Sequence, residues 1–188
     1  MHEHTPAYEE ALSLFKEFNK SESLLKHAYT VEGVMRYIAK KMGEDEEKWG
    51  IVGLMHDLDY ERFPEQHCRK SREILAEQGW PEEYIRAIVS HGWGICSDVE
   101  PKTSMEKTLY AIDELTGLVT AVAIIRPSKS VADLEVKSVM KKWKDKSFAA
   151  GVNRSIIETG TAMLGMELSD VVTDVIMGMR QVADRIGL

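Results

Sequence analysis

Hydrophobic residues recur along almost the whole chain at the three- and four-residue spacing of helices, and no stretch alternates as a half-buried strand would. The cleanest apolar stripe runs through Val171, Val175, Met179 and Ile186. Serine, glycine and proline residues divide the pattern into segments. The expected helices cover about residues 6–19, 21–42, 44–56, 65–78, 81–91, 104–125, 131–143, 148–164 and 169–186. The sequence therefore predicts an all-α protein.

The expected helices follow one another without a flexible linker, an internal repeat or a low-complexity segment. A chain of 188 residues is long enough to bury one continuous core. We therefore expect a single-domain helical bundle over residues 1–188. Its core would cover about residues 20–125, and the helices at about 131–187 would pack on that core.

Polar residues occupy positions of five expected helices where the apolar pattern predicts burial. His27, for example, lies three residues after Leu24 and four before Val31, within the apolar stripe of its helix. The others are His56, His67, His91 and Asp113. One buried imidazole is usually a satisfied core group, but leaving several of them unpaired would be costly. Five helices that each point one such group inward predict a shared metal ion.

The doublet His56-Asp57 lies at the expected end of a helix. Neighbouring residues in a regular helix point about 100° apart, so both side chains can face one site only where the backbone turns. Gly53 and the irregular residues 58–64 fit such a turn. A mixed set of imidazole and carboxylate ligands favours Fe, Mn, Zn, Co or Ni over Ca. The sequence thus predicts a divalent transition metal as cofactor.

The order of these residues resembles the HD superfamily of metal-dependent phosphohydrolases. The resemblance is carried by His27, by the doublet in GLMHDLDYE and by Asp113 in YAIDELTG. The C-terminal third also resembles the tail of uncharacterised bacterial and archaeal HD hydrolases. The family implies the HD type of helical bundle and a metal site.

Members of the HD superfamily that bind two ions have two further histidines between the doublet and the last aspartate. His67 and His91 lie in that interval. By this resemblance they would hold a second ion, and Asp57 would bridge the pair. Whether one or two ions bind stays open at this point.

The resemblance implies hydrolysis of a small phosphoester, nucleotides included, by a metal-activated water. Asp57 would belong to the catalytic centre. Such a site needs an acid near the leaving group, and Asp59 and Glu61 are the nearest candidates in the sequence. The alternative for both is a solvated loop carboxylate.

Cations and aromatic rings near these histidines are candidates for substrate binding. Lys70 lies three residues after His67 and would share its side of the helix, with Arg69 beside it. Trp93 follows His91 closely and could stack on a base. The alternative for the cations is an ordinary solvated face. A second basic region comprises Lys137, Lys141, Lys142, Lys144, Lys146 and Arg154.

Two other functions stay open: the first uses the same ligand set, and the complete ligand set argues against the second. HD-type di-iron oxygenases use these ligands to cleave C–C or C–P bonds with dioxygen. Other HD-like domains bind nucleotides without catalysis. Sequence spacing does not separate a hydrolase from an oxygenase, and it leaves the substrate, the metal and the oligomeric state open.

The charge of the chain weighs against general nucleic-acid binding. It has 24 lysines and arginines against 31 aspartates and glutamates, a net charge of −7. The longest apolar stretch, Leu118–Ile125, is too short to cross a bilayer. The segment Met1–Tyr8, with His2 and His4, has no signal-peptide core, and we assign those two histidines no metal. We therefore expect a cytoplasmic protein that does not bind membranes.

The chain has only two cysteines, Cys68 and Cys96. They form no CxxC pair, so the sequence suggests neither a zinc ribbon nor a disulfide framework. We expect two reduced thiols without a specific role.

Overall fold

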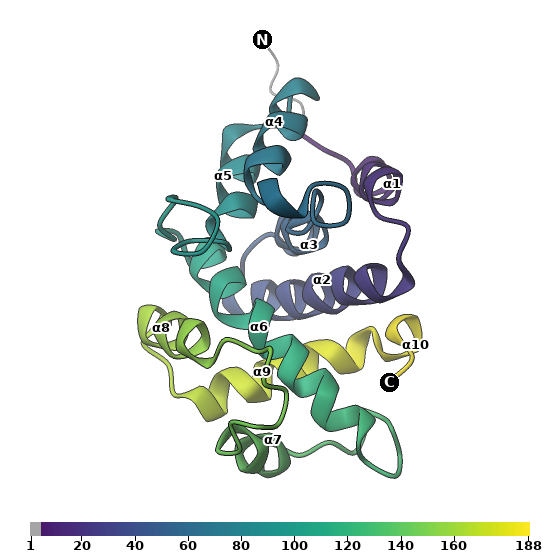
Figure 1. The fold of residues 1–188 in the computed structure, drawn as a ribbon, viewed down its shortest axis with the longest axis vertical. Helices are drawn as coiled ribbons and strands as arrows, with labels where there is room; N and C mark the ends of the chain where they lie inside the picture. The colour runs from purple at the N-terminus through teal and green to yellow at the C-terminus, as the bar shows by residue number, and fades with distance from the viewer. Residues whose placement is uncertain (1–4) are drawn as a thin grey trace.

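The computed structural model of the chain describes residues 5–188, so His2 and His4 lie outside the described residues. Within that range the chain is all-α, as predicted, and forms no β-strand. The long helices α2 and α6 organise the fold (Figure 1). The elements are α1 Tyr8–Phe18, α2 Glu22–Met42, α3 Glu46–Met55, the 3-10 helix η1 Pro64–Gln66, α4 Arg69–Glu77, α5 Glu82–Ser90, α6 Ser104–Ile124, α7 Val136–Trp143, α8 Arg154–Leu164, α9 Leu168–Gln181 and α10 Ala183–Ile186.

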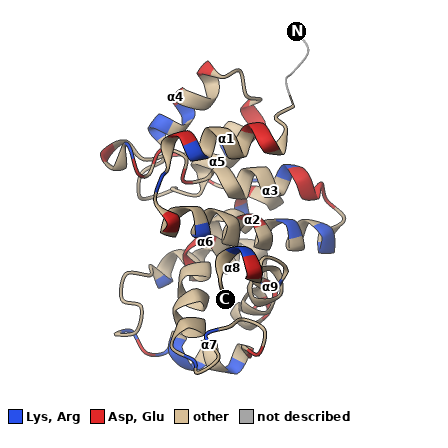
Figure 2. Cartoon of the chain, turned by 90° about the vertical axis from the view of Figure 1, so that its right-hand side faces the viewer, with Lys and Arg blue, Asp and Glu red and all other residues tan. Residues whose placement is uncertain are grey.

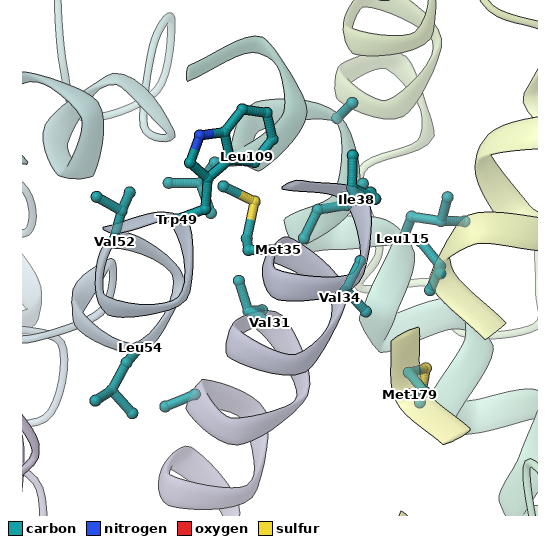
Figure 3. Packing of buried hydrophobic residues seen from close by; sticks show 14 of the residues in the cluster. Val31, Val34, Met35, Ile38, Trp49, Val52, Leu54, Leu109, Leu115 and Met179 are labelled. Atoms are coloured by element: carbon teal, nitrogen blue, oxygen red, sulfur yellow. The ribbon is translucent and has the colours of Figure 1, made fainter. Parts of the chain in front are cut away.

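Helix α2 lies across the middle of the molecule, with α1, α3, α4 and α5 on one side of it and α7, α8 and α9 on the other (Figure 1). Its buried side chains Val31 and Met35 face Trp49 of α3 and Leu109 of α6 in the core (Figure 3). One hydrophobic cluster runs from the first helices to Met179 of α9. The helices that carry the expected site are therefore packed on one another.

Close helix contacts at glycines hold the C-terminal helices against α2 and α6. A Cβ added at Gly160 of α8 would lie 2.5 Å from Ala111 Cα of α6. A Cβ at Gly178 of α9 would lie 2.6 Å from Val34 Cα of α2. Real side chains do not approach a backbone so closely, so both positions require glycine for these helices to dock.

Helix boundaries in the C-terminal half differ from the sequence prediction because the side chains of two arginines hold irregular backbone. The guanidinium of Arg180 donates to the carbonyls of Val131 and Leu134, so α7 begins at Val136 rather than near residue 131. Arg154 donates to four carbonyls of residues 143–149. Helix α8 therefore begins at Arg154 rather than near residue 148. Sequence periodicity does not reveal such long-range bonds.

Two further boundaries differ from the prediction. The expected helix at 65–78 begins at Arg69, after the 3-10 turn η1 and the positive φ of 66° at Cys68. The expected last helix is interrupted at Val182, which separates α9 from α10. None of the helices within residues 5–188 combines the length and apolarity needed to span a membrane.

Candidate metal centre

Four histidines from separate segments meet between α2, α3, α5 and α6. His27 lies on α2, His56 ends α3, His67 lies between η1 and α4, and His91 ends α5. The Nε2 atoms of His27 and His56 are 3.1 Å apart, and those of His67 and His91 are also 3.1 Å apart. The structure thus brings together all four predicted histidines as two pairs.

Asp57 lies between the two pairs and presents one carboxylate oxygen to each. Its Oδ2 is 3.3 Å from His56 Nε2 and 3.7 Å from His27 Nε2. Its Oδ1 is 3.4 Å from His67 Nε2 and 3.6 Å from His91 Nε2. The doublet converges as the sequence predicted, because the chain leaves helical geometry directly after His56.

Asp113 of α6 joins only the first pair. Its Oδ1 lies 3.0 Å from His27 Nε2 and 3.3 Å from His56 Nε2. Ligand atoms of His27, His56 and Asp57 lie within 4.8 Å of one another, a spacing that suits one metal ion. The same holds for His67, Cys68 and His91. All six predicted ligands therefore surround one centre, and Cys68 is a further candidate that the sequence analysis missed.

Backbone carbonyls fix the orientation of two of these imidazoles. His56 Nδ1 donates to the carbonyl of Gly53 at 2.7 Å, and His91 Nδ1 donates to that of Ile88 at 2.6 Å. A proton held on Nδ1 leaves the Nε2 lone pair directed into the centre. The fold therefore prepares both Nε2 atoms to bind a cation.

Asp59 holds the third imidazole in the same way. Its Oδ1 accepts from His67 Nδ1 at 2.6 Å, and its Oδ2 accepts from the backbone N–H of Ser71 at 2.8 Å. The Asp59 side chain is 0% exposed, so it is not a solvated loop carboxylate. It contacts His67 at Nδ1, the ring nitrogen that faces away from the centre, and it does not line the cavity. Its contacts in this structure are those of a residue that positions His67, and its action as an acid stays a prediction.

Glu61 lies outside the centre. Its Oε2 accepts from the backbone N–H groups of Lys20 and Ser21, at 2.7 and 2.9 Å, where α2 begins. The side chain is exposed and does not line the cavity. In this structure these contacts support the N-terminus of α2, and proton donation by Glu61 stays a prediction.

The charges of the centre stabilise one another strongly. Burial alone would lower the pKa of His56, but the carboxylates of Asp57 and Asp113 raise it well above its usual value. Burial would raise the pKa of Asp57, but the neighbouring imidazoles, His56 first, hold it well below its usual value. The imidazoles of His56 and His27 also hold the pKa of Asp113 below its usual value, against the effect of burial. Both aspartates are therefore ionised, which is the form that binds metal.

A cavity of about 420 Å³ opens beside the centre. Its polar side is formed by His27, Asp57, His67, His91 and Asp113. Its other lining residues are Leu24, Tyr60, Gly92, Ile95, Cys96, Tyr110, Glu114, Gly117, Val152 and Ile156. A volume of this size lies in the range of roughly 300–1,000 Å³ typical of small-molecule sites.

The residues expected to bind substrate lie outside this cavity. Lys70 is paired with Glu73 and lies over the ring of Phe63. Arg69 donates to the side chain of Gln66 and lines a neighbouring hollow. Both cations therefore contact neighbouring side chains and not the cavity in this structure, and substrate binding by them stays a prediction.

Trp93 and the second basic region also lie away from the cavity. The Trp93 ring packs against Tyr110 with ring centroids 5.8 Å apart, and it lines a shallower hollow next to Ile156. The lysines of α7 gather at the end of the molecule opposite α4 (Figure 2). Neither feature faces the metal centre in this structure.

Several residues on the cavity wall were missed by the sequence analysis. Tyr60 and Glu114 follow metal-ligand candidates closely in sequence, and that proximity was a usable signal. Val152 and Ile156 gave no signal, because they come from the far C-terminal part of the chain. Only the docking of α8 on α6 brings them to the site.

Comparisons with known proteins agree with this geometry. The chain is 27% identical over 101 residues to Ribonuclease Y of Oleidesulfovibrio alaskensis and 28% identical over 101 residues to Ribonuclease Y of Nitratidesulfovibrio vulgaris. Each match covers 52% of this chain but only 18% of the relative, so the chain corresponds to less than a fifth of these curated relatives. No solved structure matches the chain. The family model of the HD domain matches residues 24–118, half of the chain, and the protein therefore belongs to the HD family.

Proposed function

We propose that the protein is a metal-dependent phosphohydrolase that cleaves a small phosphoester with two divalent transition-metal ions. One observation carries the proposal: two pairs of imidazoles face opposite oxygens of a single carboxylate, Asp57. His27, His56 and Asp113 would hold one ion, and His67 and His91 the other. Asp57 would contribute to both.

The donor set fits cations well. In each pair, two Nε2 atoms lie 3.1 Å apart. The Nδ1 protons of His56 and His91 are already committed to carbonyls, so the Nε2 atoms of both rings face the centre. Such an arrangement is repulsive without a proton or a metal ion among the nitrogens. The mixture of nitrogen and oxygen ligands suits Mn, Fe, Co, Ni or Zn.

The chain's own residues supply orientation and charge. When bound, divalent ions would lower the pKa of a water molecule and polarise a phosphoryl oxygen. Asp57 lies between the two histidine pairs and contacts both of them. Asp59 fixes the orientation of the His67 ring. Tyr60 and Glu114 line the cavity beside the ligands.

Metal content and turnover test the proposal together. The untagged protein, purified without chelator, should carry one to two equivalents of a transition metal. It should hydrolyse p-nitrophenyl phosphate, lose that activity on dialysis against a chelator and regain it with added Mn²⁺. His56→Ala should bind no metal and show no turnover. A chain that binds no metal even after reconstitution would contradict the proposal.

Two further measurements on the metal-loaded protein separate the phosphohydrolase from the oxygenase and from the non-catalytic module. Oxygen consumption by an iron-loaded protein without phosphoester turnover would favour the oxygenase. Tight nucleotide binding without turnover would favour a non-catalytic module. Because the relatives are named as ribonucleases, a short RNA belongs in the substrate panel.

A further inference from the structure

The cavity beside the metal centre has an unusual charge distribution for a phosphate-binding site. Of the residues from position 5 onward, no lysine or arginine lines it. Within the described residues, the one carboxylate that lines it outside the candidate ligand set is Glu114. The remaining wall is formed by the thiol of Cys96, by two glycines and by the apolar or aromatic residues Leu24, Tyr60, Ile95, Tyr110, Val152 and Ile156. Positive charge for a substrate would thus come from the metal ions alone.

One side of this wall is built from the C-terminal part of the chain. Val152 and Ile156 lie beyond residues 24–118, the part matched by the HD family model. The backbone N–H of Asn153 donates to Glu114 Oε2 at 3.0 Å, which ties this loop to the helix that carries Asp113. This part of the cavity is thus fixed relative to the metal ligands.

We propose that the substrate is a monoester with a single phosphoryl group and an uncharged, largely apolar body, and that Glu114, Val152 and Ile156 select it. The inference rests on the proposed phosphohydrolase function. A second phosphate or a nucleic-acid strand needs further cationic partners, and this wall offers a carboxylate instead. An apolar body gains free energy by covering Val152 and Ile156. The wall therefore disfavours polyanions and favours monoesters whose body is uncharged.

A substrate series tests this selection with the metal-loaded chain. The value of kcat/KM should be at least about tenfold higher for phenyl phosphate than for a nucleoside diphosphate or a short RNA. Ile156→Ala should raise KM more for phenyl phosphate than for ethyl phosphate, with kcat nearly unchanged. Glu158→Ala, at an exposed position of the same helix, is the matched control and should change neither value.

Charge at the wall is tested separately. Glu114→Gln keeps an oxygen for the N–H of Asn153 but removes the negative charge. It should raise kcat/KM for the diphosphate several-fold relative to phenyl phosphate. Two results would overturn the inference without contradicting the phosphohydrolase function. One is hydrolysis of p-nitrophenyl phosphate with a preference for polyanions. The other is a substrate preference that neither Ile156→Ala nor Glu114→Gln changes. A chain without turnover of any ester would instead contradict the proposed function.

A different observation concerns the two cysteines. Their Sγ atoms lie 3.0 Å apart, although the residues are 28 positions apart in the sequence. Cys68 is buried beside His67, whereas Cys96 is exposed and lines the cavity. Gly92 leaves the space for the pair, because a Cβ at that position would collide with both sulfurs. The two thiols are therefore brought together by the fold and not by a sequence motif.

We infer that Cys68 and Cys96 are a modification site, at which hydrogen peroxide forms an intramolecular disulfide. Two S–H bonds and the O–O bond break, one S–S bond and two water molecules form, and peroxide takes up the two electrons. The sulfurs need to approach by only about 1 Å to reach bonding distance. The bond would tie the loop after His91 to the residue next to His67, beside the cavity.

Thiol counting tests this site without reference to activity. The metal-loaded chain is treated with peroxide, denatured, alkylated and weighed. Loss of both alkylatable thiols, a monomer lighter by two hydrogen atoms, and recovery with dithiothreitol are expected. Cys96→Ser should form no intramolecular disulfide. Two thiols that stay alkylatable, sulfinic acid on either sulfur, or a disulfide only between chains would overturn the inference.

Discussion

The two halves of the candidate metal centre are built differently. The half with His27, His56 and Asp113 takes its side chains from the packed helices α2, α3 and α6, and it has its own carboxylate. The half with His67 and His91 has no second aspartate at its Nε2 atoms, and His67 lies on non-helical backbone held by Asp59. Rigid helices and more ligands favour tighter binding. The first half should therefore bind its ion more tightly than the second.

The largest expected effect comes from the residues that serve the first half. His56→Ala removes a fully buried ligand that the Gly53 carbonyl orients, and Asp57→Ala removes the carboxylate between the halves. Both should abolish metal binding and turnover together, measured as metal per chain and as hydrolysis of p-nitrophenyl phosphate. Circular dichroism would check that each variant stays folded. Full metal occupancy in a folded variant would show that the ligand assignment is wrong.

The second half should be separable from the first. His91→Ala leaves His27, His56, Asp57 and Asp113 in place, so one ion should remain and one should be lost. Elemental analysis after dialysis gives the count, and turnover should fall by at least about a hundredfold, since two ions act on opposite oxygens of the displacement. An unchanged metal count would remove the two-metal site and leave His91 as a core or substrate residue.

The sequence could predict the first half better than the second for a physical reason. His27 and Asp113 lie in long helices whose apolar spacing shows which face is inward. His67 was expected at the start of a helix, but it lies before the helix begins, where periodicity carries no information on side-chain direction. The role of Asp59 was missed for the same reason. Ile156 reaches the cavity because Gly160 lets α8 pack closely on α6, and these two helices are distant in sequence.

A smaller effect is expected from the residue that orients His67. Asp59→Asn keeps one carbonyl oxygen but places an amide group against either His67 Nδ1 or the Ser71 N–H, both of which donate. The affinity for the second ion should fall about 10- to 100-fold, as for other residues behind a metal ligand. Metal titration should show this loss with the first ion unaffected. An equal loss of both ions would mean that the halves are not independent.

The smallest effect is expected from Glu61, for which a change in stability can be measured separately from a change in catalysis. Glu61 accepts from the N–H groups of Lys20 and Ser21 at the start of α2, the helix that carries His27. Glu61→Ala should lower the free energy of unfolding by about 1 kcal/mol, the usual contribution of such bonds at a helix start, as measured by urea denaturation. Metal content and kcat should not change. If kcat instead fell a hundredfold at unchanged stability, Glu61 would be the acid that its place after the doublet first suggested, and the cavity would have to close over it during turnover.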